Sequence, residues 1–220
     1  MPAAGRWLLT ARGKAHGGAR GVPDWALSMD GAQLFRRALD QATAVVSRVG
    51  AADLGLPTPC TEWDVRALAA HMLYEVSWVP DIVAGATIAE VGDRHDGDLM
   101  RGDLGGSWRR AAEGALAAAA RCDPAATAHL SYGDVTNDDY LRQQGADQLI
   151  HAWDLGVATG IAVRFDPEVA AAVHAGTLPH LEGMRASGLF APPHPVPEGA
   201  GIQARVIALF GRDPGWSPPG

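Results

Sequence analysis

The sequence predicts an all-α fold, a bundle of four or five amphipathic helices. Apolar residues recur at spacings of three and four over segments of roughly 15–22 residues, which is the period of a helix with one buried face. The connections between these segments contain proline or glycine and are mostly short. Hydrophobic residues make up 47% of the chain and charged residues 20%, which suits a packed core. In a chain of 220 residues, we expect residues 29–216 to form one domain.

Residues that typically cap or end helices predict the bounds of the first two helices. Asp30 can cap a helix whose apolar stripe runs to Gly50, where the glycine ends it. A rigid connection with two prolines then leads to Thr61, which we expect to begin the second helix. Asp64 stands three residues later, as in a weaker form of the capping box. This helix should continue until Pro80 kinks or ends it.

A loop should separate the second helix from the third. Residues 85–104 contain many Gly and Asp and show little periodicity. Ser107 can cap the third helix, which should stop before Pro124. The segment that follows, residues 127–137, has β-branched and aromatic residues around a Gly-Asp pair. It predicts either a short hairpin or an extended connection.

The last part of the chain predicts one long helix and shorter segments after it. Asn137 can cap the fourth helix, and Gly160 can end it. Asp166 precedes a proline and a glutamate that suit the first turn of a fifth helix. Residues 190–201 form a proline-rich loop, and residues 202–210 should form a short helix.

Composition excludes several classes of function. The net charge of −7 argues against a nucleic-acid groove or a surface for anionic membranes. No apolar run approaches the roughly 20 residues that a membrane-spanning helix needs. Cys60 and Cys122 fit free thiols in a reducing cytoplasm. Residues 1–28 are rich in Gly, Ala and Arg, so we expect a disordered extension, with Met29 as the functional start.

Two histidines stand inside apolar helical segments. Asp147 and His151 are one helical turn apart, so their side chains project together and can hold one cation. On a surface helix such a pair is more often a solvated hydrogen bond, but the neighbours of His151 are apolar, as are those of His71. A buried histidine needs a partner, either a hydroxyl or carbonyl group or a metal ion. Spacing by itself slightly favours a hydrogen bond to a hydroxyl or carbonyl group over a metal ion.

Other side chains carry weaker signals, each with a plain structural alternative. Asp154 could accept a proton from an imidazole, and Glu75 could be a spare ligand or general base, but surface positions are the simpler interpretation for both. Cys60 could be activated by a helix N-terminus, although a small buried residue is the simpler interpretation. His180 could approach a cleft. Of the tryptophans on predicted helices, most should lie in the core and one or two beside the candidate site: Trp63, Trp78, Trp108 and Trp153.

Three motifs carry a resemblance to a known family: "LGLPTPCTEWDVRALAAHM", "DQLIHAWDLGVATG" and "ALFGRDP". They resemble the actinobacterial metal-binding family related to the N-terminal domain of mycothiol-dependent maleylpyruvate isomerase, within the DinB-like superfamily. The resemblance extends from about Asp30 to Pro214. It implies a four-helix bundle with a crossover connection, short C-terminal helical segments, and one divalent metal ion, as a rule zinc. The implied ligands are His71, Asp147 and His151.

One of the three implied ligands departs from the family pattern. The acidic ligand of the isomerase is a glutamate, where this chain has the shorter Asp147. Either the helix lies closer to the metal or a water molecule completes the coordination. Three protein ligands leave one position open, as in catalytic zinc sites.

The resemblance implies chemistry with a low-molecular-weight thiol such as mycothiol. The expected activity is that of an S-transferase or isomerase-like enzyme in the cytoplasm, acting on a small thiol and an electrophile; a homodimer is compatible with the sequence. Maleylpyruvate isomerisation is not carried over, because the isomerase has a further C-terminal domain at its active site and this chain ends soon after "GRDP". Alternatives are a metal-dependent hydrolase, with Glu75 as base, and a non-catalytic metal-binding or stress module. A fourth protein ligand, such as Glu75 or His180, would favour the module.

Overall fold

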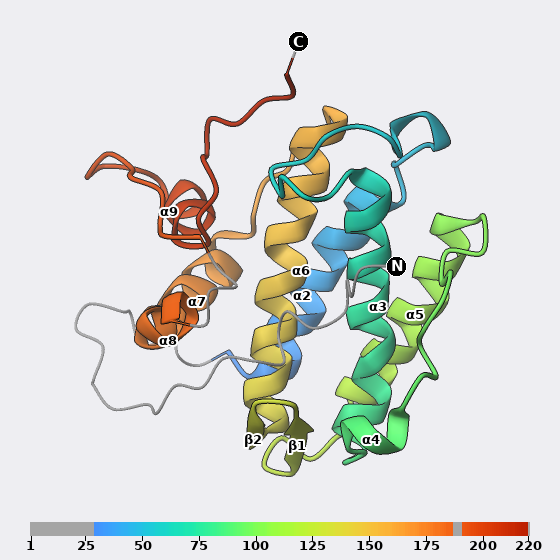
Figure 1. The fold of residues 1–220 in the computed structure, drawn as a ribbon. Helices are drawn as coiled ribbons and strands as arrows, with labels where there is room; N and C mark the ends of the chain where they lie inside the picture. The colour runs from blue at the N-terminus through green and yellow to red at the C-terminus, as the bar shows by residue number, and fades with distance from the viewer. Residues whose placement is uncertain (1–28, 187–190, 220) are drawn as a thin grey trace.

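Long helices packed side by side form the bundle that the sequence predicts (Figure 1). The structure is a computed structural model that describes residues 29–186 and 191–219, so the extension expected at residues 1–28 lies outside the described residues. The bundle helices are α2 (Gly31–Val46), α3 (Val65–Val83), α5 (Leu104–Ala119) and α6 (Asn137–Thr159). After α3 the chain passes through α4 (Ile88–Val91) and a long loop that returns along the side of the bundle, so α3 and α5 run in the same direction (Figure 1). This loop is the expected crossover connection.

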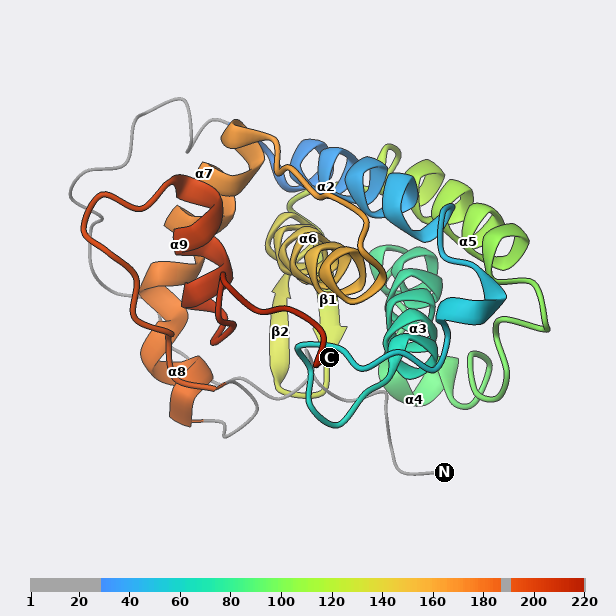
Figure 2. The same cartoon turned by 90° about the horizontal axis from the view of Figure 1, so that it is seen from above.

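The C-terminal part of the chain adds a second group of helices beside the bundle. These are α7 (Pro167–Thr177), α8 (Leu181–Ala186) and α9 (Ile202–Leu209). Their apolar side chains share a second hydrophobic cluster with the outer sides of α2 and α6. Seen from above, the segment after α9 crosses over the end of α6 towards the loop that precedes α3 (Figure 2). Arg212 and Trp216 of this segment thereby contact the bundle.

The remaining elements are short. Two are 3-10 helices, η1 (Ala51–Asp53) and η2 (Leu178–His180), and two are strands, β1 (Thr127–Leu130) and β2 (Gly133–Thr136). The strands pair antiparallel, so the hairpin interpretation of this segment is correct. None of the helices in the described part of the chain combines the length and the apolar character that a membrane crossing requires.

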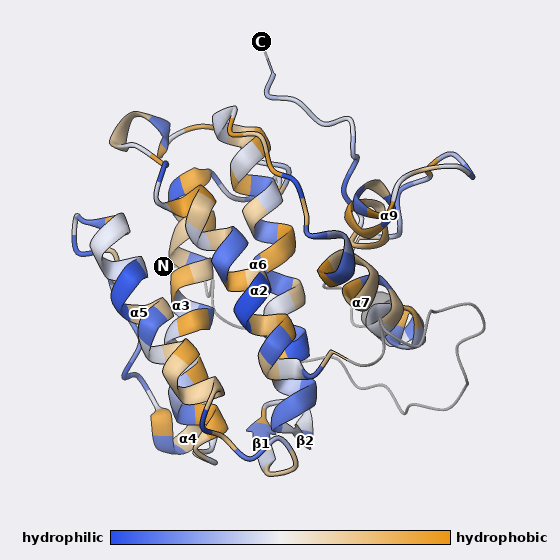
Figure 3. Cartoon of the chain, turned by 180° about the vertical axis from the view of Figure 1, so that it is seen from behind, coloured by the Kyte–Doolittle hydropathy of each residue, from blue (hydrophilic) through white to orange (hydrophobic). Residues whose placement is uncertain are grey.

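Helices α3 and α6 face each other in the bundle and differ in the polarity of their buried residues. Helix α3 is apolar around most of its surface and is coloured mainly as hydrophobic in Figure 3. Helix α6 turns a stripe at spacings of three and four towards the core, and the middle of that stripe is polar. Gln144, Gln148 and His151 are 1%, 0% and 7% exposed. Polar side chains at such positions need partners inside the bundle.

The start of α2 agrees with the sequence, and the start of α3 does not. Asp30 caps α2 with its carboxylate, but the helix ends at Val46, before the predicted Gly50. Helix α3 is capped by Asp64 and begins at Val65, so the prediction that Thr61 begins it is wrong. An aspartate carboxylate accepts a first-turn N–H at least as well as threonine does, which explains why Asp64 is the cap.

Two further caps lie one or more residues from their predicted positions. Asp103, not Ser107, caps α5, because the Ser107 hydroxyl donates instead to a backbone carbonyl. Thr136, not Asn137, caps α6. The Asn137 amide is buried and donates to two backbone carbonyls from other parts of the chain. In each case a hydrogen bond to a carbonyl outside the helix takes the side chain that the local pattern assigned to capping.

Pro80 does not end α3. The helix continues through it to Val83. Proline lacks only one backbone donor, and burial of the residues on either side holds the last turn in place: Val79, Ile82 and Val83.

Candidate metal centre

The three ligands implied by the resemblance converge on one point between α3 and α6. His71 comes from the first half of α3, and Asp147 and His151 are one turn apart on α6. One donor atom from each lies within 4.8 Å of the others. Asp147 stands between the two imidazoles, with Oδ1 3.3 Å from Nε2 of His151 and Oδ2 3.7 Å from Nε2 of His71.

This spacing fits a small divalent cation. Ligand bonds of about 2.0–2.2 Å at a tetrahedral zinc ion place the ligand atoms about 3.3–3.6 Å apart. The separations of 3.3 and 3.7 Å from Asp147 to the two imidazoles are close to that range, with Oδ1 nearest to His151 and Oδ2 nearest to His71. Asp147 therefore reaches both histidines directly, in spite of its short side chain.

His71 provides a second, independent sign that a partner belongs here. Its side chain is fully buried, and within the described residues neither ring nitrogen has a hydrogen bond. An unpaired buried polar group costs on the order of 1–3 kcal/mol. The interpretation as a core histidine bonded to a hydroxyl or carbonyl group therefore lacks its partner, whereas a cation at Nε2 would supply one.

The charge state of Asp147 suits a ligand. Burial by itself would raise the pKa of Asp147, but the adjacent His151 outweighs it and holds the pKa well below the usual range. Burial would lower the pKa of His151, but the Asp147 carboxylate raises it well above the usual value. The carboxylate is therefore ionised at neutral pH, and a cation at Nε2 of His151 would take the place of a proton.

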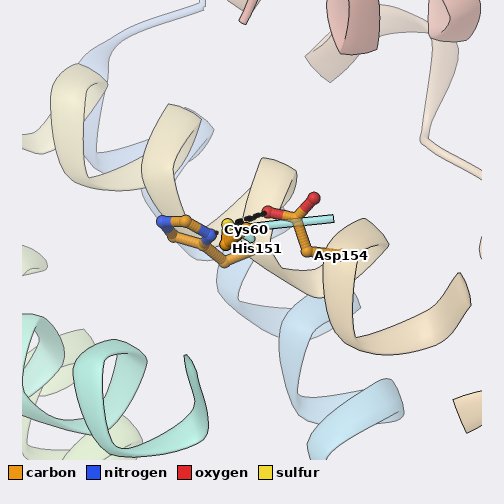
Figure 4. A group of neighbouring side chains, drawn as sticks. All are labelled: Cys60, His151 and Asp154. Carbon is orange, nitrogen blue, oxygen red and sulfur yellow. Dashed lines mark hydrogen bonds and ion pairs between the residues drawn. The ribbon is translucent and has the colours of Figure 1, made fainter. Parts of the chain in front are cut away.

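His151 is fixed on its other side by Asp154 (Figure 4). The imidazole Nδ1 lies 3.0 Å from Oδ2 of Asp154, and the Cys60 thiol donates to the same oxygen at 3.3 Å. Asp154 is completely buried, so the surface position favoured for it by the sequence is wrong, and its alternative role as partner of an imidazole is the one seen. Cys60 likewise makes polar contacts that a simple packing residue would not. With Nδ1 donating to Asp154, Nε2 of His151 faces Asp147, the side on which a cation would take the place of the proton.

Arg212, from the segment after α9, completes this group. Its guanidinium donates to Asp154 at 3.0 Å and to the sulfur of Cys60 at 3.1 Å. Cys60, His151 and Asp154 also have donor atoms within 4.8 Å of one another, but the guanidinium already supplies positive charge to this group. Burial would raise the pKa of Asp154, and the charge of Arg212 lowers it instead. We therefore interpret this cluster as a support for His151 and not as a second metal site.

Behind His71 lies Glu75, one turn further along α3. Glu75 is 4% exposed, so the surface position favoured by the sequence is wrong. Its Oε2 accepts a hydrogen bond from Gln144 at 3.1 Å, and its Oε1 lies 4.0 Å from Nδ1 of His71. Burial raises the pKa of Glu75 against the opposing effect of His71. Glu75 faces Nδ1 of the ring, whereas Asp147 faces Nε2.

Trp63 lines the site beside both imidazoles. Its ring centroid lies 4.7 Å from that of His71 and 6.0 Å from that of His151, and the side chain is half-buried. The other three tryptophans on predicted helices are core residues, as expected: Trp78, Trp108 and Trp153. His180 is exposed and belongs to neither donor group.

Three supporting residues were not identified from the sequence. Gln144 and Gln148 carry a signal that could have found them, because two glutamines at core spacing in one helix call for polar partners. Gln148 donates to Asp147 at 3.2 Å. Arg212 stands within the "GRDP" motif, but no local spacing connects it with residues on α6.

Comparisons with known proteins found one matching family and a curated relative. The family described as "Mycothiol maleylpyruvate isomerase N-terminal domain" matches residues 35–156, a span that includes all three converging residues. An uncharacterized protein of Mycobacterium tuberculosis, MT0763 in strain CDC 1551 / Oshkosh and Rv0738 in strain H37Rv, is 32% identical over 191 residues. The match covers 84% of this chain and 98% of that protein. No solved structure gave a significant match.

Proposed function

The chain belongs to the mycothiol maleylpyruvate isomerase N-terminal domain family, and from this premise we propose that it binds one divalent metal ion and activates a low-molecular-weight thiol. His71, Asp147 and His151 are the ligands. The observation that carries the proposal is the triangle formed by their three donor atoms, one of which belongs to the buried His71 imidazole, whose two nitrogens have no hydrogen bond among the described residues. We propose zinc as the metal and mycothiol as the thiol.

The ligand set supports zinc and an open position. Two imidazole nitrogens and one carboxylate oxygen are typical zinc ligands, and three of them leave a fourth tetrahedral position for a small molecule. A divalent cation bound there would supply the positive charge that deprotonates a coordinated thiol, whose ordinary pKa is about 8.5. Asp147 contributes one negative charge and the neutral imidazoles none, so the three ligands by themselves offset only half of a dication's charge, and its remaining charge would favour a thiolate at the fourth position.

Other residues of the chain hold the ligand side chains in place and line the site. Asp154 and Arg212 hold the His151 ring, and Trp63 presents an apolar face beside both imidazoles. The thiol gives up its proton to solvent, and its sulfur forms the new bond to an electrophilic carbon. In a substitution, the leaving group departs with the electron pair of the bond that breaks. In an addition to a conjugated double bond, the π electron pair moves to the electron-withdrawing group, and the resulting anion takes a proton from solvent.

Two alternatives receive less support from the geometry. Hydrolysis requires a base beside the attacking water, and the candidate Glu75 lies behind the His71 ring, away from the donor triangle. A closed, non-catalytic site requires a fourth protein ligand. Neither Glu75 nor His180 belongs to the donor group formed by the three ligands.

The test begins with metal content and continues with thiol chemistry. Protein purified without chelators or an affinity tag should contain about one equivalent of metal by elemental analysis, and His151→Ala should lose most of it while its circular dichroism stays helical. Equal metal content in the two proteins would contradict the ligand assignment.

The metal-loaded protein is then incubated with mycothiol and 1-chloro-2,4-dinitrobenzene. Conjugation should be faster than in buffer, and chelation or His151→Ala should remove the acceleration. If the loaded protein gives only the buffer rate with mycothiol, glutathione and bacillithiol and with several classes of electrophile, thiol activation is wrong even where the metal is bound.

A further inference from the structure

Two buried polar atoms without partners face each other behind the candidate metal site. Nδ1 of His71 and Oε1 of Glu75 are both buried, and neither has a hydrogen bond to any residue that the structure describes. They lie 4.0 Å apart, beyond the usual limit of about 3.2 Å for an N–H···O hydrogen bond. A shift of about 1 Å would join them.

The surroundings of Glu75 show that this carboxylate is held in place. Gln144 on α6 donates to its other oxygen at 3.1 Å, and both side chains are almost completely buried. A carboxylate and an amide in the middle of a helical bundle cost stability compared with apolar residues of similar size. Packing alone does not explain them, and a role in holding a neighbouring group would.

We propose that Glu75, held by Gln144, is the positioning residue for His71 and accepts a hydrogen bond from its Nδ1–H when Nε2 binds the metal. The inference rests on the proposed metal site and deepens it. A neutral imidazole carries one N–H, so binding a cation through Nε2 places the hydrogen on Nδ1, where it points at Oε1 of Glu75. A carboxylate in this position orients the ring and strengthens the ligand.

His151 shows the same arrangement already formed. Its Nδ1 lies 3.0 Å from the carboxylate of Asp154, which Arg212 and Cys60 hold in place. Both ligand histidines therefore have a buried carboxylate behind them. The His151 ring is fixed in advance, whereas the His71 ring becomes fixed as the metal binds.

The charges near the site also favour a divalent cation in the presence of an ionised Glu75. Three almost completely buried carboxylates, Glu75, Asp147 and Asp154, lie around the two imidazoles, and Arg212 is the buried cation paired with them. Two negative charges remain when all three acids are ionised and both imidazoles are neutral, as they must be to bind a cation. A dication balances them.

The decisive variant is Glu75→Gln, which keeps the size of the side chain and its place beside Gln144. We expect Zn²⁺ to bind 10–100-fold more weakly, measured by competition with a chromophoric chelator. The unfolding midpoint of the metal-free variant should be unchanged or higher, because a buried carboxylate has been removed. The control is Glu113→Gln, an exposed position on α5, which should change neither quantity. A merely structural role for Glu75 predicts the opposite pattern, with a lower midpoint and unchanged metal affinity.

A second measurement does not depend on any variant. In protein labelled with ¹⁵N-histidine, addition of Zn²⁺ should produce a slowly exchanging Nδ1–H signal from His71. The same protein given buffer without metal should not show this signal. Wild-type protein that binds Zn²⁺ without this signal, or Glu75→Gln protein that binds as tightly as wild type, overturns the role of Glu75 and leaves the metal site standing. Wild-type protein that binds no Zn²⁺ overturns the metal site itself.

Discussion

At the residue scale, Asp154 is where the C-terminal segment meets the helix that carries two ligands. Its carboxylate contacts His151, Cys60 and Arg212 and has no exposure to solvent. A buried carboxylate is stable only when its charge is paired. The arginine that pairs with it lies 58 positions further along the chain, so the ion pair joins the end of the described chain to the bundle.

Arg212→Met tests this pairing. The variant keeps an unbranched side chain but leaves Asp154 without its cation, and we expect a loss of about 3–5 kcal/mol in the free energy of unfolding, measured in urea. The matched control is Arg205→Met, at an exposed position of α9, which should change stability by less than about 0.5 kcal/mol. Similar small losses in both variants would show that the buried ion pair contributes little.

At the element scale, α2 and α6 pack closely because a glycine lies between them. A Cβ atom at Gly145 would stand 2.3 Å from a methyl group of Leu34 and 3.2 Å from the backbone of Phe35. The backbone of α2 cannot move aside as a flexible side chain can. Gly145 also lies two residues before Asp147, so a displaced α6 would shift the candidate ligands.

Gly145→Ala should therefore destabilise the protein by about 1–3 kcal/mol, although alanine is the better helix former. Gly114→Ala is the matched control, because Gly114 is exposed on α5 with nothing within 4 Å of the added atom. That variant should stabilise by about 0.5–1 kcal/mol. Unfolding in urea measures both changes, and a gain in both variants would mean that close contact between α2 and α6 is not required.

At the scale of the whole molecule, a metal between α3 and α6 should stabilise the entire fold. The ligands come from two helices that the metal would hold together, and the unfolded chain lacks this arrangement. At a metal concentration 100 times the Kd, the gain should be about 2.7 kcal/mol. A chelator should lower the thermal unfolding midpoint of the purified protein, and added Zn²⁺ should restore it.

His151→Ala should abolish this response to metal. His129→Ala is the comparison, because His129 lies in the hairpin, partly exposed and paired with Asp134, away from the site. That variant should respond as the wild type does. A response that survives in His151→Ala would place the stabilising metal elsewhere.

The sequence by itself determined the helices and part of the site. Asp30 and Gly160 mark helix ends as predicted, because capping and the left-handed φ of 71° at Gly160 are local properties. Helical periodicity places Asp147 and His151 on one face, and the resemblance to the family added His71. A pattern within one helix cannot place a residue of a second helix.

Only the tertiary structure decided which polar groups are buried and what they touch. Glu75 and Asp154 have no local feature that separates them from surface acids, and they are buried because of the helices and the C-terminal segment that pack over them. Arg212 meets Asp154 only because the chain end returns over α6. Burial and pairing depend on contacts between distant parts of the chain, whereas helix formation and spacing depend on neighbouring residues.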